Sequence, residues 1–297
     1  MIERVPYRDL QFWKFCGYGF LKNLRFFDPF LLLFFRDAGL TFLAIGSLIS
    51  IRELSTHLLE LPTGILADVF GRRRAMLIGF SSYVGSFFLF YIGHSFWMFA
   101  LAMLLFSLGE TFRSGTHKAM IMEHIRREGY EHLKVAYYGR TRSASQFGSA
   151  VSALIAAGLV FWTGSYRVIF LATIAPYIAN LALLASYPRR LDGEDITRAA
   201  AGWAPLRARG LLAVRDFIGF FRNPRTLRGL LSGATFDAVH KSSKDYLQPV
   251  LKAQALSLPL LLGFAAEQRA AVLIGVVYFF LYLGTSAASA HAGAIHD

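Results

Sequence analysis

The sequence predicts an all-α, polytopic membrane protein folded as a helical bundle, and three observations lead to this fold class. The 297 residues are 55% hydrophobic and only 17% charged, with a mean hydropathy of +0.44, whereas soluble domains carry about 25% charged residues. Apolar stretches long enough to cross a bilayer recur along the chain. Basic residues, which give a net charge of +12, collect on alternate connecting segments, as they do in cytoplasmic loops.

The same observations exclude several classes of protein. Disorder requires low hydrophobicity, and a soluble nucleic-acid binder would explain the charge but not the apolar bulk. The single cysteine, Cys16, allows no internal disulfide and gives no metal cluster. The first residues lack the small-residue cleavage site of a signal peptide. We therefore expect no nucleic-acid partner, no cofactor, no metal and no leader.

The apolar stretches predict eight membrane-spanning helices, because about 20 residues are needed to cross a bilayer. They are too long for transmembrane strands, which alternate over about 10 residues. The expected spans are 10–36, 40–66, 75–93, 97–121, 143–163, 167–187, 228–250 and 270–290.

These spans divide the chain into three parts. Residues 1–187 form a six-span bundle, residues 188–224 a cytoplasmic linker, and residues 225–297 a partial second bundle of two spans. Within the linker, residues 210–224 place apolar side chains opposite charged ones, which is typical of a helix lying in the membrane interface. The alternative is that residues 210–224 are a fragment of span seven, which Pro224 disfavours.

The basic residues predict the orientation in the bilayer. One set of alternate segments holds the basic clusters within 4–8, 72–74, 126–142 and 189–228. The opposite set holds only Arg36, Arg167, Lys252 and Arg269. Because cytoplasmic loops carry the excess of Lys and Arg, we expect a multi-pass protein of the cell inner (cytoplasmic) membrane with its N-terminus in the cytoplasm.

Five of the predicted spans carry polar side chains at helical spacing. Ionisable groups at membrane depth are costly and usually face a cavity or a partner, so the five stripes predict a polar central cavity. The stripes are Tyr18, Lys22, Arg25 and Pro29; Arg52, Thr56, Glu60 and Thr63; Glu110, Arg113 and His117; Arg142, Gln146 and Ser149; and Asp237, Lys241, Lys244 and Gln248.

An alternative explanation for these charges is a set of structural ion pairs within single helices, where residues three or four apart can meet. The candidate pairs are Glu110 with Arg113, Arg25 with Asp28, and Asp237 with Lys241.

The segment GILADVFGRRR (64–74) carries the strongest local signal. Its pattern, Gly-x-x-x-Asp-x-x-Gly-Arg-Arg, resembles the loop signature of the major facilitator superfamily. Gly64 would allow close approach of a neighbouring helix, and Gly71 would permit a tight turn. Asp68 would pair with Arg72 and face a helix N-terminus, while Arg72 and Arg73 would hold the loop inside. The segments GETFRSGTHKAMI and YGRTRSASQFGSA are also similar to one bacterial branch of this superfamily.

The resemblance implies a secondary active transporter that exposes a midplane site alternately to each side of the membrane. The expected partners are a small polar solute, protons and the lipid bilayer. The expected cavity residues are Lys22, Arg25, Arg52, Arg113, Gln146, Lys241 and Lys244. The candidates for taking a coupling proton are Glu53, Glu110, His117 and Asp237. The sequence does not identify the solute.

Two other functional classes remain as alternatives. A membrane-embedded enzyme using Glu110, His117 and Lys118 is disfavoured, because no nucleophile motif, zinc motif or phosphate loop is present. The second alternative is a truncated, non-transporting remnant or a half-assembly that requires a partner. The superfamily architecture has two six-helix halves, and this chain would supply one half, the linker and two further helices.

Overall fold

The structure is a computed structural model that describes residues 9–192, 228, 247–259 and 261–290. Every regular element in these residues is helical, which confirms the predicted fold class. The helices are α1 (Leu10–Lys22), α2 (Leu31–Asp37), α3 (Phe42–Phe70), α4 (Arg72–Ile92), α5 (Phe96–Arg113), α6 (Thr116–Arg127), α7 (Lys134–Thr163), α8 (Val168–Ala185) and α12 (Ala266–Ala290). Residues 247–257 form a further helix.

Within the described residues, six helical segments are long and apolar enough to cross a membrane: Phe42–Glu60, Arg72–Ile92, Phe96–Arg127, Glu131–Thr163, Val168–Ala185 and Ala266–Ser289. The expected interfacial helix at 210–224 lies outside the described residues, as does nearly all of the predicted span at 228–250. The division into three parts therefore stays a prediction.

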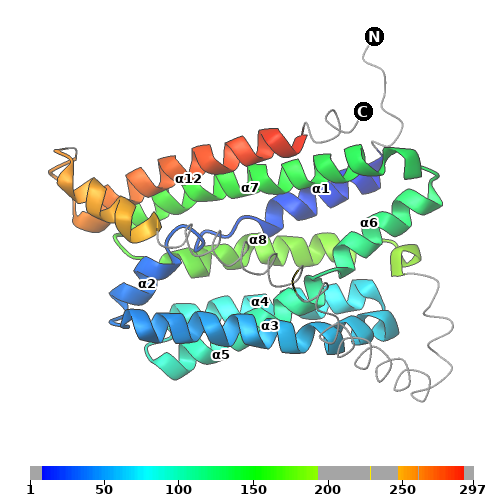
Figure 1. Cartoon of the computed structure of the whole chain (residues 1–297), viewed down its shortest axis with the longest axis horizontal. Helices are drawn as coiled ribbons and strands as arrows, with labels where there is room; N and C mark the ends of the chain where they lie inside the picture. The colour runs from blue at the N-terminus through cyan, green and yellow to red at the C-terminus, as the bar shows by residue number, and fades with distance from the viewer. Residues whose placement is uncertain (1–8, 193–227, 229–246, 260, 291–297) are drawn as a thin grey trace, which may run out of the picture.

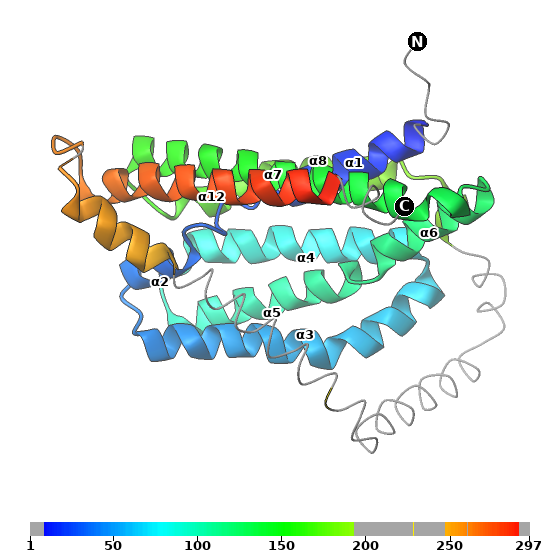
Figure 2. The ribbon, with the colours of Figure 1, turned by 45° about the horizontal axis from the view of Figure 1, so that its top comes forward.

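The helices pack roughly along one common direction (Figure 1). On one side α12 lies against α7 over its length, and α1 packs between α7 and α8. On the other side α5 packs between α3 and α4, while α4 also contacts α8 and so joins the two groups (Figure 2). Span one contacts both groups of helices, because α2 also touches α3.

The predicted span at 10–36 is not one continuous helix. It consists of α1 and α2 with a non-helical break at 23–30. The Asn23 side-chain amide donates to Ser145 O (2.7 Å) and Ser149 Oγ (2.9 Å) of α7, which fixes the end of α1. The expected helical stripe through Arg25 is therefore wrong in detail, since Arg25 reaches the interior from the break.

A buried glutamine satisfies backbone groups on the far side of this break. Gln248 Nε2 donates to Asp28 O (3.0 Å), and Leu32 N donates to Gln248 Oε1 (3.0 Å). Gln248 is completely buried, so the two bonds join the break to the helix at 247–257. A second break follows α5, where Ser114 and Gly115 separate it from α6.

The core is dominated by aromatic rings. Phe27 stacks on Phe170 with ring centroids 5.5 Å apart, and Tyr83 meets Tyr177 edge to face at 5.3 Å. Such arrangements add stability beyond the burial of area alone. Glycine allows the close approach of α1 and α7, because a Cβ at Gly148 would lie 2.5 Å from Phe20 O. The contacts of Phe27 and Phe20 hold span one against α8 and α7.

Candidate functional site

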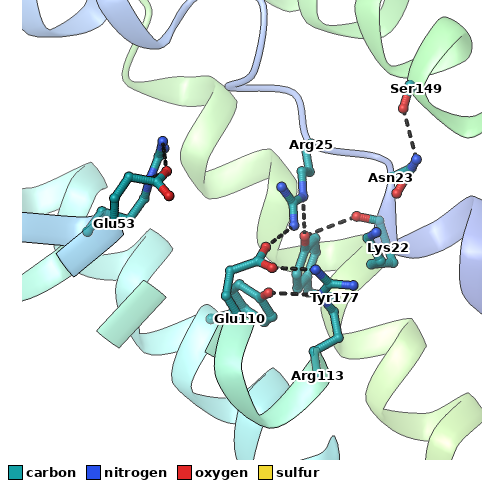
Figure 3. Close-up of polar contacts among 10 residues, drawn as sticks. Lys22, Asn23, Arg25, Glu53, Glu110, Arg113, Ser149 and Tyr177 are labelled. Atoms are coloured by element: carbon teal, nitrogen blue, oxygen red, sulfur yellow. Dashed lines mark hydrogen bonds and ion pairs between the residues drawn. The ribbon is translucent and has the colours of Figure 1, made fainter. Parts of the chain in front are cut away.

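Glu110 lies between two arginines in the interior of the bundle (Figure 3). Its Oε1 pairs with Arg25 from the span-one break, and its Oε2 pairs with Arg113 one turn along α5. The three side chains are about one-fifth exposed. The expected intrahelical pair of Glu110 with Arg113 is therefore present, but Arg25 pairs with Glu110 rather than with its neighbour in sequence, Asp28.

Two tyrosines hold the guanidinium groups in place. Arg25 Nε donates to Tyr177 Oη (3.2 Å), and Arg113 Nε donates to Tyr83 Oη (3.2 Å). Tyr177 Oη in turn donates to Lys22 O at the end of α1 (3.0 Å; Figure 3). Both rings are completely buried, so α4 and α8 position the two arginines of span one and α5.

A cavity of about 420 Å³ lies between α1, α6 and α7, and we call it the α6 cavity. His117 lines it and stacks on Tyr18 with ring centroids 3.7 Å apart. Its remaining polar lining comes from the ends of α1 and α5, the first turn of α6, and α7. Those side chains are Lys22, Asn23, Arg113, Ser114, Lys118, Tyr138, Thr141, Arg142, Ser145 and Gln146.

A second cavity of about 350 Å³ lies between the span-one break, α3 and α5, and we call it the α3 cavity. Arg52 and Glu53 of α3 form an ion pair at its wall (2.8 Å). Ser107 Oγ donates to Arg52 O (2.9 Å), which ties α3 to α5 at this level. Lys22 and Arg113 line both cavities, so these two residues lie next to both.

Both cavities are lined in part by members of the polar stripes. The described members of the predicted set all line one or both cavities: Lys22, Arg25, Arg52, Glu53, Glu110, Arg113, His117 and Gln146. The remaining predicted members, Asp237, Lys241 and Lys244, lie outside the described residues. Which residues contact a solute or take a proton stays a prediction.

Sequence reasoning missed two residues of the site, Tyr83 and Tyr177. Tyr83 and Tyr177 stood within apolar runs, and the signal was that a buried tyrosine hydroxyl normally needs a polar partner. Arg142 lay on a stripe expected to face the cavity and Lys118 on span four, but neither was named among the expected solute contacts. Both line the α6 cavity.

The signature segment forms the turn between α3 and α4. Gly71 alone separates the two helices and has a φ of +93°, a conformation that side-chain-bearing residues rarely adopt. The expected tight turn is therefore present, and Arg72 and Arg73 are the first two residues of α4. The expected close approach at Gly64 is wrong for the described residues, because a Cβ there would meet nothing within 4 Å. The side chain of Asp68 is not among those described.

Solved structures of transporters share this fold. The chain is similar to a variant of the nucleoside transporter NupG, with a TM-score of 0.68 and 14% identity over 90% of this chain and 64% of that one. It is also similar to the peptide transporter POT in complex with sulfate, with a TM-score of 0.54 and 13% identity over 91% and 65%. The chain thus spans somewhat less than two thirds of each neighbour's length. No curated protein matches it in sequence.

The sequence profile of the Major Facilitator Superfamily matches residues 18–297. This match covers nearly the whole chain, and the solved transporters agree with it in fold. The helical segments of spanning length indicate a multi-pass membrane protein. The chain belongs to the Major Facilitator Superfamily.

Proposed function

We propose that the protein is a secondary active transporter that moves a small polar solute across the cytoplasmic membrane by alternating access. One observation carries the proposal most directly: two polar cavities share Lys22 and Arg113 in their walls. A solute site placed there can open to either side if the two groups of helices rock against each other.

The break in span one supports this mechanism. Arg25 comes from the break and pairs with Glu110 of α5, while Asn23 is hydrogen-bonded to α7. Movement of span one would therefore change the salt bridges at the site. In the proposed cycle the solute contacts Lys22, Arg25, Arg52, Arg113 and Gln146 together with Lys241 and Lys244. One of Glu53, Glu110, His117 and Asp237 takes the coupling proton.

In the proposed orientation the N-terminus is cytoplasmic, and the turn at Gly71 lies at the cytoplasmic gate. The experiment that tests the proposal is uptake by vesicles reconstituted with the purified chain. Labelled sugars, nucleosides, amino acids and organic acids are offered with and without an imposed pH gradient. We expect at least one solute to accumulate above protein-free vesicles, and accumulation to rise when the outside is acidic.

Two results would count against separate parts of the proposal. Uptake that is indifferent to the pH gradient would remove proton coupling and leave transport in place. No uptake of any solute, from a preparation that unfolds cooperatively, would contradict transport by this chain. The matched control for the substrate site is Lys134→Gln, because Lys134 is exposed at the start of α7 and lines neither cavity.

A further inference from the structure

The α6 cavity has an uneven charge. Four basic residues line it, Lys22, Arg113, Lys118 and Arg142, and no aspartate or glutamate does so among the described residues. The α3 cavity differs, because Asp28, Glu53 and Glu110 face its basic residues. The positive charge therefore concentrates on the side of the site formed by α1, α6 and α7.

This charge is not compensated within the described part of the chain. Glu110 is already shared between Arg25 and Arg113, which leaves that cluster with a net positive charge. No described carboxylate lies within ion-pair distance of Lys22 or Arg142. Arg142 and Lys118 are exposed where they line the cavity, so a ligand that carries negative charge can reach these basic groups.

The first turn of α6 adds a second attraction for anions. The helix has 12 residues and begins after Gly115, whose φ is +74° and which offers no side chain to cap the free N–H groups. Ser114 and Gly115 line the α6 cavity. Uncapped N–H groups and the helix dipole favour a negatively charged group at such an end. The N-terminus of α6 and the basic side chains therefore both favour a negative charge in the α6 cavity.

We propose that the α6 cavity binds a small organic anion through its carboxylate or phosphate group. Lys22 and Arg142 contact the charged group, and Asn23, Thr141 and Gln146 provide hydrogen bonds to the rest of the molecule. The volume of about 420 Å³ lies within the range of small-molecule sites. This inference rests on the proposed function as a transporter and names the charge class of its solute.

The test compares pairs of compounds that differ in charge, using thermal unfolding of the full chain in detergent at low salt. The pairs are glucose and glucose 6-phosphate, uridine and uridine 5′-monophosphate, and benzyl alcohol and benzoate, with inorganic phosphate alone as a further probe. A ligand that binds the folded state raises the unfolding midpoint. We expect the charged member of at least one pair to stabilise the protein more than its neutral partner.

Substitutions locate the binding. Lys22→Gln and Arg142→Gln each remove one charge-assisted contact, so each is expected to weaken the affinity about tenfold. Lys22→Arg keeps the charge and is expected to retain binding even if Lys22→Gln lowers the midpoint without ligand. Lys134→Gln, an equal loss of charge on the same helix as Arg142, is expected to bind like the unmodified chain.

Three results would overturn the inference: equal stabilisation by neutral and charged partners, no stabilisation by any anion, or unchanged affinity in both Lys22→Gln and Arg142→Gln. The anion site and the transport function can fail independently of each other. Uptake of a neutral solute without anion binding would keep transport and reject the anion site. Anion binding without uptake would keep the site and reject transport.

Discussion

Glu110 accepts hydrogen bonds from guanidinium groups on two different parts of the chain. Arg25 belongs to the break in span one, and Arg113 belongs to α5. The carboxylate is the common counter-ion that allows both guanidiniums to lie inside the bundle. Buried ion pairs gain little net stability over apolar packing, yet removing one partner is costly because a charge is left uncompensated. Glu110 therefore has a structural role whether or not it takes part in coupling.

We expect Glu110→Gln to destabilise the protein by about 1.5–3 kcal/mol, the range for hydrogen bonds to charged groups. The amide keeps the shape of the side chain but leaves two guanidiniums without a counter-ion. Denaturant unfolding in detergent measures the loss. The control is Glu128→Gln, because Glu128 pairs with Arg190 at 3.7 Å on the exposed surface, where such pairs are worth about 0–1 kcal/mol. Equal losses in the two variants would show that the shared carboxylate has no special role.

At the scale of elements, the break in span one is the feature on which the site depends. It exposes backbone groups inside the bundle, which must be hydrogen-bonded where no water is present. The Gln248 side chain satisfies two of these groups: it donates a hydrogen bond to the carbonyl of Asp28 and accepts one from the amide of Leu32. The glutamine thereby couples the end of span one to the helix at 247–257.

Gln248→Leu is expected to lower the free energy of unfolding by about 1–3 kcal/mol, because it leaves two buried backbone groups without partners. The matched control is Gln254→Leu in the same helix, since Gln254 is exposed and an exposed substitution changes stability by about 0.5 kcal/mol or less. Unfolding of both variants under one set of detergent conditions makes the comparison. A Gln248→Leu protein as stable as the control would show that the break is satisfied in another way.

Local spacing grouped several of the residues that line the cavities, because residues three or four apart on a helix face the same way. It did not predict the partner of Arg25, which lies 85 residues away in Glu110 and is brought near by tertiary packing. The break at 23–30 was missed for the same reason. Its hydrogen bonds to Ser145, Ser149 and Gln248 depend on segments far along the chain.

At the scale of the whole molecule, basic residues on the connecting segments that are expected to face away from the cytoplasm have structural partners. Arg36 donates to Leu40 O (2.8 Å), and Arg167 donates to Tyr91 O (3.1 Å) and Gly93 O (2.6 Å). These bonds satisfy carbonyl groups at chain turns. On the other set of segments, Arg126 and Arg127 pair with Glu123, and α4, α6 and residues Arg189–Asp192 contact one another.

This division of charge leads to the prediction for orientation. Lys and Arg are enriched on the cytoplasmic side, so the end with residues 72–74 and 126–127 is expected to face the cytoplasm. Cys16 is the single cysteine and is buried, so Cys16→Ser gives a background without thiols. Into it we would introduce Arg74→Cys, exposed at the start of α4, or Leu262→Cys, 70% exposed before α12.

In right-side-out membrane vesicles, a membrane-impermeant maleimide is expected to label Leu262→Cys directly, because this position lies at the end with few basic residues. Arg74→Cys should be labelled only after the vesicles are permeabilised. The Cys16→Ser background should stay unlabelled in both cases. Labelling of Arg74→Cys in sealed vesicles, with Leu262→Cys protected, would place the basic end outside. The clustering of basic residues would then need a cause other than membrane topology.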